Sequence, residues 1–354
     1  MKSEELRDNK NKIMKRDLLL DNLRALVMIQ IVCIIHVLYF FRIGDEYIRS
    51  LLLFEMPAIF FIAGASQSLA TQPKTIKHTI ISKSKRILIP FYVYLAILYI
   101  WMAVVTFTHL QLGVDVDITL LSRQEILKTL ITGGCDNIPF YGYTWFISIY
   151  LIVSLSLPIQ QRILNYVDKY LYIALWISIV VIMSFVTFPS ANLEIKNLII
   201  YNVFYLIGFC FYKHKLKPMV YIVALITIPI TIYGFVSGIM LPMQNHKFPA
   251  DYLFLFFGLA WLSVLAIIIS HIKQKYYRLL NVWNRNGYYL YLYQTITFSV
   301  IVCITYKWID QIEYDSLKFA IYFVLCFCIN TLLAYIIQHI LSYSSSIKAR
   351  IINI

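Results

Sequence analysis

The sequence predicts an all-α integral membrane protein with about ten transmembrane helices and with both the N- and C-termini in the cytoplasm. Of its 354 residues, 60% are hydrophobic and only 14% are charged, whereas a soluble domain carries about 25% charged residues. The mean hydropathy is +0.72. The apolar residues also form runs of about 20, which is the length of a helix that crosses a bilayer. Since the length fits one compact bundle, we expect a single membrane-embedded domain over residues 1–354.

Ten apolar segments along the chain are candidate transmembrane helices, and the sixth is the shortest. No internal repeat is visible, which disfavours the inverted-repeat transporters. The segments cover, in order, residues 18–41, 48–69, 87–107, 143–160, 170–188, 197–212, 219–241, 252–272, 287–306 and 317–341.

The distribution of lysine and arginine orients the bundle. With the N-terminus inside, the inner segments hold 22 of the 31 lysines and arginines and the outer segments hold 8. Cytoplasmic loops carry such an excess, so we expect a basic cytoplasmic tail over residues 1–17 and a cytoplasmic C-terminus. The net charge of +13 then indicates loops that face anionic lipid and no nucleic-acid partner.

The basic N-terminus resembles the start of a secretory signal peptide. However, the apolar run that follows is too long and lacks an obvious small-residue cleavage site. We therefore expect this run to be retained as the first helix of a multi-pass protein of the inner (cytoplasmic) membrane.

The first segment carries three ionisable side chains in a nearly continuous apolar run, namely Asp21, Arg24 and His36. Ionisable groups are expensive to bury inside a membrane helix, so each is a functional candidate. His36 lies about six residues past the midpoint of the segment, roughly 9 Å toward the outer face at 1.5 Å per residue.

The second segment runs in the opposite direction and places Glu55 at a depth similar to that of His36. A carboxylate beside a histidine raises its pKa and fixes its tautomer, which suits a general base. This predicts a catalytic pair in which Glu55 orients His36. The other interpretation is a histidine that bonds to a neighbouring helix and a glutamate in the headgroup zone.

Basic side chains mark the inner ends of the first and third segments. Arg24 lies on the inner side of the first, and Arg86 begins the third with Lys83 and Lys85 beside it. Guanidinium and ammonium groups at one depth form an anion site suited to phosphates. For Lys83 and Lys85 an ordinary positive-inside flank is the better interpretation, but for Arg24, which lies deeper among apolar residues, it is not.

The outer loop over residues 107–143 is the longest extracytoplasmic connection. Within it, the stretch 122–125 reads SRQE, a capping box that could open a short helix ending at Gly133 and Gly134. Such a helix could cover an outward-facing cavity. A plain surface connector is an equal alternative.

Aromatic and amide side chains begin the fourth and ninth segments and are candidates for the lining of a cavity. Trp145 starts the fourth segment at the outer interface, where aromatic belts are normal. In the ninth, Tyr288 and Tyr291 share a helix face and could offer hydroxyls to a cavity, with Gln294 one turn further. Belt or packing roles are at least as good an interpretation.

The six cysteines support neither a disulfide framework nor a metal site. Five of them lie in apolar segments, where a free thiol behaves as a small hydrophobe. The sixth, Cys135, lies in a loop without a loop partner. We therefore expect no bound metal.

Five stretches match, in order, the motifs of one known family of membrane enzymes. LDNLRALVMIQIVCIIH (20–36) resembles its opening Asp-x-x-Arg and apolar run to a His, and FEMPAIFFIAGAS (54–66) resembles its Pro-x-x-Phe-Phe-x-Ser-Gly. KSKRILIPFYVY (83–94) resembles its Arg-x-x-x-Pro-x-Tyr. TWF (144–146) matches its Trp-Phe helix start, and GYYLYLYQ (287–294) resembles Ser-Tyr-x-x-Tyr-Leu-x-His. Together they resemble the acyltransferase-3 family of integral membrane O-acyltransferases, over nearly the whole chain.

This resemblance implies an activity and a set of site residues. Members transfer an acyl group, usually acetyl from cytoplasmic acetyl-CoA, to a glycan or lipid-linked sugar at the far face. The family's first-helix Arg and His correspond to Arg24 and His36, and its third-helix Arg corresponds to Arg86. The resemblance implies acyl-CoA as co-substrate rather than a bound cofactor. The implied partners are membrane lipid, a carbohydrate acceptor (exopolysaccharide, capsule or lipid-linked glycan) and polysaccharide-assembly proteins.

The chain departs from the family pattern in its first helix. The family has ten residues between the Arg and the His, whereas this chain has eleven, Ala25 to Ile35. At about 100° per residue, a separation of twelve turns His36 about 120° away from Arg24, whereas eleven leaves the two nearly in line. A single-turn π-bulge absorbs one residue and restores the common face. We therefore predict a π-bulge between Ala25 and Ile35.

Two further departures concern side chains. Ala63 stands at the family's Ser position before Gly64. Gly287 and Gln294 stand at the family's Ser and His positions, so we expect no acid–base chemistry there, although Gln294 can still form hydrogen bonds.

The interpretation that accounts for most of these observations is a membrane O-acyltransferase that modifies a cell-surface carbohydrate. In it, Arg24 and Arg86 bind acyl-CoA, His36 with Glu55 and Arg24 forms the catalytic set, and five residues line the cavity. Two alternatives use the same scaffold without acyl chemistry: a glycan exporter or transporter, and a subunit of a polysaccharide-assembly machine. The cavity-lining residues are Asp21, Trp145, Tyr288, Tyr291 and Gln294.

Overall fold

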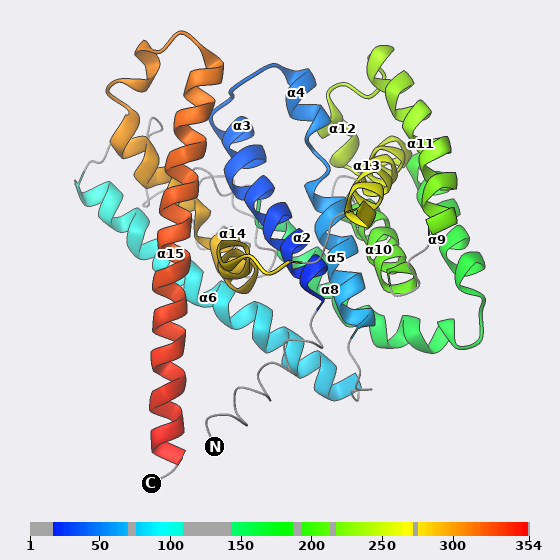
Figure 1. Ribbon diagram of the computed structural model, residues 1–354, viewed down its shortest axis with the longest axis horizontal. Helices are drawn as coiled ribbons and strands as arrows, with labels where there is room; N and C mark the ends of the chain where they lie inside the picture. Colours follow the sequence, from blue (N-terminus) through cyan, green and yellow to red (C-terminus); the bar gives the residue numbers. More distant parts are fainter. Residues whose placement is uncertain are drawn as a thin grey trace.

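The computed structural model describes residues 17–69, 76–108, 143–186, 193–212, 217–271 and 275–352, and every named element within these ranges is a helix. Figure 1 shows their arrangement. The elements are α2 (Leu18–Ile29), the π-helix η1 (Gln30–Ile35), α3 (His36–Phe40), α4 (Glu46–Leu51), α5 (Glu55–Ser68), α6 (Ile76–Thr108), α8 (Trp145–Leu164), α9 (Lys169–Ser184), α10 (Leu193–Phe211), α11 (Lys217–Val236), α12 (Met243–Lys247), α13 (Tyr252–His271), α14 (Arg278–Thr305), the 3₁₀ turn η4 (Ile309–Gln311) and α15 (Asp315–Ile352).

The all-α membrane class is confirmed. Eight spans within the described ranges are long and apolar enough to cross a membrane. Two shorter apolar helices, Lys169–Ser184 and Ile195–Phe211, correspond to the fifth and sixth expected segments. The total of ten crossings and the cytoplasmic position of the termini stay predictions.

The first span contains the predicted π-bulge. A π-helix covers Gln30–Ile35, inside the predicted interval, and joins α2 to α3 without a break. Upstream, Asp17 caps α2 by accepting a hydrogen bond from the Leu20 backbone N–H. His36 is 8% exposed and therefore faces the protein interior.

Helices α5 and α10 form the closest crossing, and two glycines make it possible. A Cβ added at Gly64 would lie 1.9 Å from the carbonyl oxygen of Tyr205, and one added at Gly208 would lie 2.0 Å from that of Phe61. Small residues allow membrane helices to approach to backbone contact in this way. As a result α5 lies in the middle of the bundle, with most of its residues buried.

The remaining helices enclose this centre. α2 packs against α5 and α14, α10 also contacts α9, α13 contacts α11, and α15 packs along α14. Figure 1 shows α15 and α6 toward one side of the bundle and α9 and α11 at the other, with α2, α5 and α14 between them.

Several helices extend beyond their expected ends. α6 begins at Ile76, so residues 76–86, expected as loop, continue the third helix, and α14 begins at Arg278 rather than at residue 287. The second segment is divided into α4 and α5 by a turn at residues 52–54. Apolar length marks the part of a helix that can cross lipid, whereas the helix itself continues through charged turns. The expected capping box at 122–125 lies outside the described residues.

Candidate active site

His36 is held by a hydrogen bond to Gln294 of α14, with 2.6 Å between His36 Nδ1 and Gln294 Oε1. Gln294 is fully buried. Because an amide oxygen only accepts hydrogen bonds, Nδ1 carries the proton in this arrangement. Nε2 is then the basic nitrogen, and it has no hydrogen-bond partner among the described residues. The orientation is that of a general base.

Aromatic rings surround the imidazole of His36. Its ring centroid lies 5.3 Å from that of Phe40, 5.5 Å from Tyr143 and 6.1 Å from Tyr291. The Tyr143 hydroxyl donates to the Leu292 backbone carbonyl at 2.7 Å and so ties the start of α8 to α14. These rings limit the access of water to the imidazole.

The predicted pairing of Glu55 with His36 is wrong. Glu55 is fully buried, and its Oε1 lies 2.5 Å from Nζ of Lys247, which is itself buried in α12. A carboxylate inside the bundle requires a cationic partner, and the loop between α11 and α13 supplies one. His36 therefore receives its orientation from Gln294 and not from Glu55.

Arg24 is fixed near the start of the first span. Its guanidinium donates to Asn284 Oδ1 at 3.0 Å and to the Ser66 hydroxyl, and one nitrogen lies 3.5 Å from Asp21 Oδ1. Asp21, expected to line the cavity, thus acts on Arg24 directly. The Arg24 side chain keeps 31% of its surface exposed, so an anion can reach it.

Arg86 lies near the same end of α14. It is exposed on α6, and the next residue, Ile87, accepts a hydrogen bond of 2.8 Å from the Tyr288 hydroxyl. Tyr288 is one helical turn from Asn284, the partner of Arg24. Arg24 and the backbone next to Arg86 are thus both tied to the first turns of α14, and an anion site formed by the two arginines stays a prediction.

Lys83 and Lys85 differ from each other. Lys85 is exposed, as a positive-inside flank should be. Lys83, expected as the same kind of flank, is buried and donates to the Ser154 backbone carbonyl at 2.8 Å. Because α6 begins earlier than expected, Lys83 lies on a helix face that packs against α8, and it joins the two helices.

The hydroxyls of Tyr288 and Tyr291 are not offered to a cavity. The first bonds to Ile87, and the second donates to the Tyr143 backbone carbonyl at 2.6 Å, which favours the packing interpretation. The ring of Tyr291 still contacts His36. The ring of Trp145 lies beside the ion pair of Glu55 and Lys247, with 6.0 Å between its centroid and Lys247 Nζ.

Sequence reasoning missed Lys247, Asn284 and Ser66. In the sequence, Lys247 is one of the eight lysines and arginines of the expected outer segments. Lys247 lies in a short connection with several other polar residues, so the sequence does not mark it as the partner of a buried carboxylate. Asn284 and Ser66 carry no signal without the fold, because nothing in the sequence places them beside Arg24.

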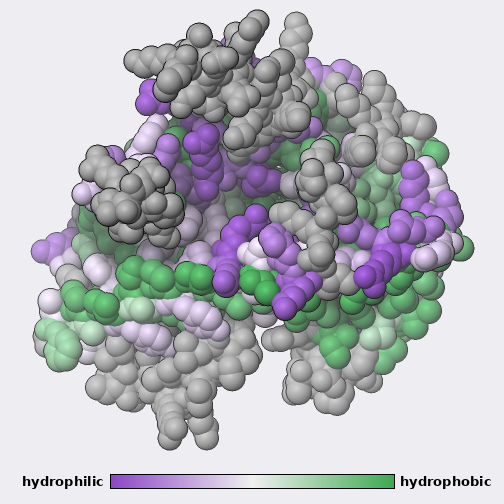
Figure 2. Space-filling model, turned by 90° about the horizontal axis from the view of Figure 1, so that it is seen from below, coloured by the Kyte–Doolittle hydropathy of each residue, from purple (hydrophilic) through white to green (hydrophobic). Residues whose placement is uncertain are grey.

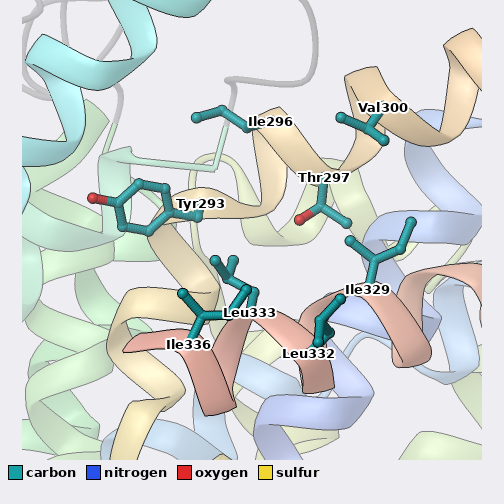
Figure 3. Close-up of a pocket in the computed structure, with 8 residues that line it drawn as sticks. All are labelled: Tyr293, Ile296, Thr297, Val300, Ile329, Leu332, Leu333 and Ile336. Atoms are coloured by element: carbon teal, nitrogen blue, oxygen red, sulfur yellow. The ribbon is translucent and has the colours of Figure 1, made fainter. Parts of the chain in front are cut away.

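A separate groove of about 200 Å³ lies between α14 and α15. Figure 3 shows it between apolar side chains of the two helices, with Thr297 directed toward it. It contains none of the predicted site residues. Its lining consists of Tyr293, Ile296, Thr297, Val300, Ile329, Leu332, Leu333 and Ile336.

Within the described ranges, no group of three or more His, Cys, Asp or Glu side chains could hold a metal ion.

Comparison with known proteins places this geometry in context. The model of the acyltransferase-3 family, described as an acyltransferase domain, matches residues 17–339. The match extends from the cap of α2 into α15 and includes His36, Gln294 and Arg24. Comparisons with curated proteins and with solved structures give no match.

Proposed function

Since the chain belongs to the acyltransferase-3 family and is a membrane acyltransferase, we propose that it is an O-acyltransferase of the cytoplasmic membrane. In this proposal it moves an acyl group, most simply acetyl, from cytoplasmic acyl-CoA to a hydroxyl of a cell-surface or exported carbohydrate. Polysaccharide-assembly proteins are its expected neighbours.

The observation that carries the proposal is the position of His36 relative to Arg24. Helix α2 and the π-helix η1 separate the two by twelve residues, about 18 Å at 1.5 Å per residue. Without the π-helix, His36 would turn away from Arg24. The extended pantetheine arm of acyl-CoA has a comparable reach, so phosphates at Arg24 place the thioester near His36.

The inner end of the site binds the donor. Arg24, held by Ser66 and Asn284, and the exposed Arg86 present guanidinium groups that bind phosphate in a bidentate manner. Asp21 orients Arg24 from one turn away.

The chemical step uses His36 as a general base. Nε2 removes the proton from the acceptor hydroxyl while the hydroxyl oxygen attacks the thioester carbonyl carbon. The tetrahedral intermediate collapses with cleavage of the carbon–sulfur bond, and the imidazolium returns the proton to the CoA thiolate. The products are an ester and free CoA. The aromatic rings around the imidazole limit hydrolysis of the donor.

The test is the O-acyl ester content of the surface polysaccharides, measured by proton NMR. Wild type, a deletion, and the deletion complemented with wild type, His36→Ala or His271→Ala are compared. We expect the deletion to lose ester, wild type and His271→Ala to restore it, and His36→Ala to fail despite normal expression. His271 is a matched control because it lies at the exposed end of α13.

Two results would contradict the proposal. Unchanged ester content in the deletion, with a fall in total surface glycan, would identify an exporter. Full ester content with His36→Ala would leave the family assignment intact and remove His36 from the mechanism.

A further inference from the structure

Glu55 and Tyr201 each have a buried polar atom that lacks a hydrogen-bond partner among the described residues. Both residues are fully buried, and Glu55 Oε2 and the Tyr201 hydroxyl have no hydrogen bond among the described residues. An unsatisfied buried polar group costs about 1–3 kcal/mol. Such groups therefore require an explanation, and a ligand that completes their hydrogen bonds is one.

The two atoms belong to one cluster, made of Glu55, Tyr201, Trp145 and Lys247. Lys247 Nζ pairs with Glu55 Oε1 and lies 6.0 Å from the Trp145 ring centroid. The Tyr201 and Trp145 centroids are 5.6 Å apart. Trp145 is only partly buried and provides the accessible edge of the cluster.

A chain of aromatic rings connects the cluster to His36 from the side away from Arg24. A chain of ring contacts joins Tyr201 to Phe60 at 4.7 Å, Phe60 to Phe146 at 5.4 Å, and Phe146 to Tyr291 at 5.4 Å. Tyr291 in turn contacts His36. Glu55 is the first residue of α5, so the cluster lies at the end of α5 opposite Ser66, the partner of Arg24.

The charge balance of the cluster selects the chemistry of the ligand. Lys247 already compensates the Glu55 carboxylate, so the pair carries no net charge. A charged ligand would be buried without compensation, which is costly. A neutral hydroxyl fits, because it donates to Glu55 Oε2, and the Tyr201 hydroxyl can serve a second hydroxyl as donor or acceptor.

We infer that the cluster of Glu55, Tyr201, Trp145 and Lys247 is the acceptor subsite, and that it binds a neutral, polyhydroxylated ligand such as a sugar ring with one hydroxyl directed toward His36. This inference rests on the proposed function and specifies where the acceptor binds. Glu55 and Tyr201 are positioning residues for the acceptor, and Nε2 of His36 performs the proton transfer.

The inference is tested with the purified full chain in lipid nanodiscs, which leave both faces open to solvent. The donor is radiolabelled acetyl-CoA, and the acceptor is the host's surface polysaccharide after mild base has removed its esters. KM is measured for each substrate in turn. We expect Tyr201→Phe to raise the acceptor KM about fivefold, since it removes one hydrogen bond, with an unchanged donor KM.

Tyr201→Phe is informative because it removes only an unpartnered hydroxyl. If the role of Tyr201 were structural, the change would leave activity unaffected and stability equal or higher. Its control is Tyr212→Phe, directly after the last residue of α10, where the hydroxyl donates to Asp17 at 3.0 Å. The control should leave both KM values unchanged.

A second variant removes the ion pair as a unit. Glu55→Leu combined with Lys247→Met replaces both charges by apolar side chains, which a buried pair tolerates better than the loss of one partner. We expect the acceptor KM to rise about tenfold or more with the donor KM unchanged. Arg24→Lys serves as a reference for the donor site. It should raise the KM for acetyl-CoA and leave the acceptor KM unchanged.

The outcomes separate the two proposals. If wild type transfers label to the polysaccharide and both cluster variants keep the wild-type acceptor KM, or raise both KM values equally, the subsite is overturned alone. If wild type transfers no label, the proposed function is wrong, and the subsite falls with it.

Discussion

Gln294 stands where the family pattern has a histidine, and in this chain it is the hydrogen-bond partner of His36, the proposed base. Its Oε1 accepts a hydrogen bond from Nδ1 of His36 at 2.6 Å, inside a buried contact between α3 and α14. An amide does not titrate, so the tautomer of His36 is fixed regardless of the protonation of its partner. In the proposed mechanism, His36 is therefore the one acid–base side chain of this pair.

We expect Gln294→Leu to lower kcat about 10- to 100-fold, which is typical of the loss of a partner that orients a reactive group. The imidazole would lose its preferred tautomer, while both KM values stay near wild type because Gln294 belongs to neither of the two proposed substrate sites. The measurement is the initial rate of label transfer from acetyl-CoA. A wild-type kcat for Gln294→Leu would show that His36 needs no orientation from α14.

At the scale of elements, the π-helix η1 could be predicted from the number of residues between Arg24 and His36. Eleven residues in a regular α-helix turn the two side chains to different faces, and a π-bulge is one of the few ways to restore a common face. The partner of Glu55 could not be predicted in this way. It comes from α12, a five-residue helix in the connection between α11 and α13, and no periodic pattern links such a connection to the centre of the bundle.

We expect deletion of Ile34 from η1 to preserve activity, since the shortened stretch can form a regular α-helix with ten residues between Arg24 and His36. Insertion of one alanine after Ile29 should abolish transfer, because it rotates His36 by about 100°. Polysaccharide ester content in the complemented deletion strain measures both. Equal activity in the two variants would contradict the register argument.

The connection between α11 and α13 carries a pH-sensitive contact outside the membrane-spanning segments. His246 Nδ1 lies 2.7 Å from Asp251 Oδ2, and Nε2 lies 2.9 Å from the Ile239 carbonyl oxygen. Two acceptors favour an imidazole that donates from both nitrogens. The hydrogen bond to Asp251, together with its charge, raises the pKa of His246 above its ordinary value even though burial opposes this.

A histidine pKa that is raised by folding contributes stability that is fully present below the unfolded value of about 6.5. This contribution is lost as the pH rises through the folded value. We therefore expect His246→Gln to lower Tm in nanodiscs more at pH 5.5 than at pH 8.5. An equal loss of Tm at both pH values would show that the imidazolium form adds nothing to the connection.

At the scale of the whole molecule, two polar clusters lie on opposite sides of His36. Arg24 with Arg86 lies toward the start of α14, and Glu55 with Lys247 lies beside α12. Figure 2, which views the face toward which α2 begins and α15 ends, shows hydrophilic side chains gathered in its central part. Large apolar side chains such as Ile100 and Leu225 are exposed on the periphery, at 66% and 76%, as expected for a surface in lipid.

This arrangement performs transfer across the membrane only if the arginine side faces the cytoplasm, where acyl-CoA is made. The start of α2 is fixed to the start of α14 by a 2.8 Å hydrogen bond from Asn22 Nδ2 to the Lys275 carbonyl oxygen. Lys275 and Arg24 are therefore at the same face. The excess of lysine and arginine predicts that this face is cytoplasmic, which places the α11–α13 connection outside.

We expect a membrane-impermeant maleimide to label Asn245→Cys on intact cells and to label Lys275→Cys only after permeabilisation. Both positions are exposed, and each change is made in a chain whose native cysteines are replaced by alanine. Labelling of Asn245→Cys in both preparations controls for reagent access. If Lys275→Cys reacts on intact cells instead, the donor site faces outward. Cytoplasmic acyl-CoA then cannot reach Arg24, and the direction of transfer proposed for this enzyme is wrong even if His36 proves essential.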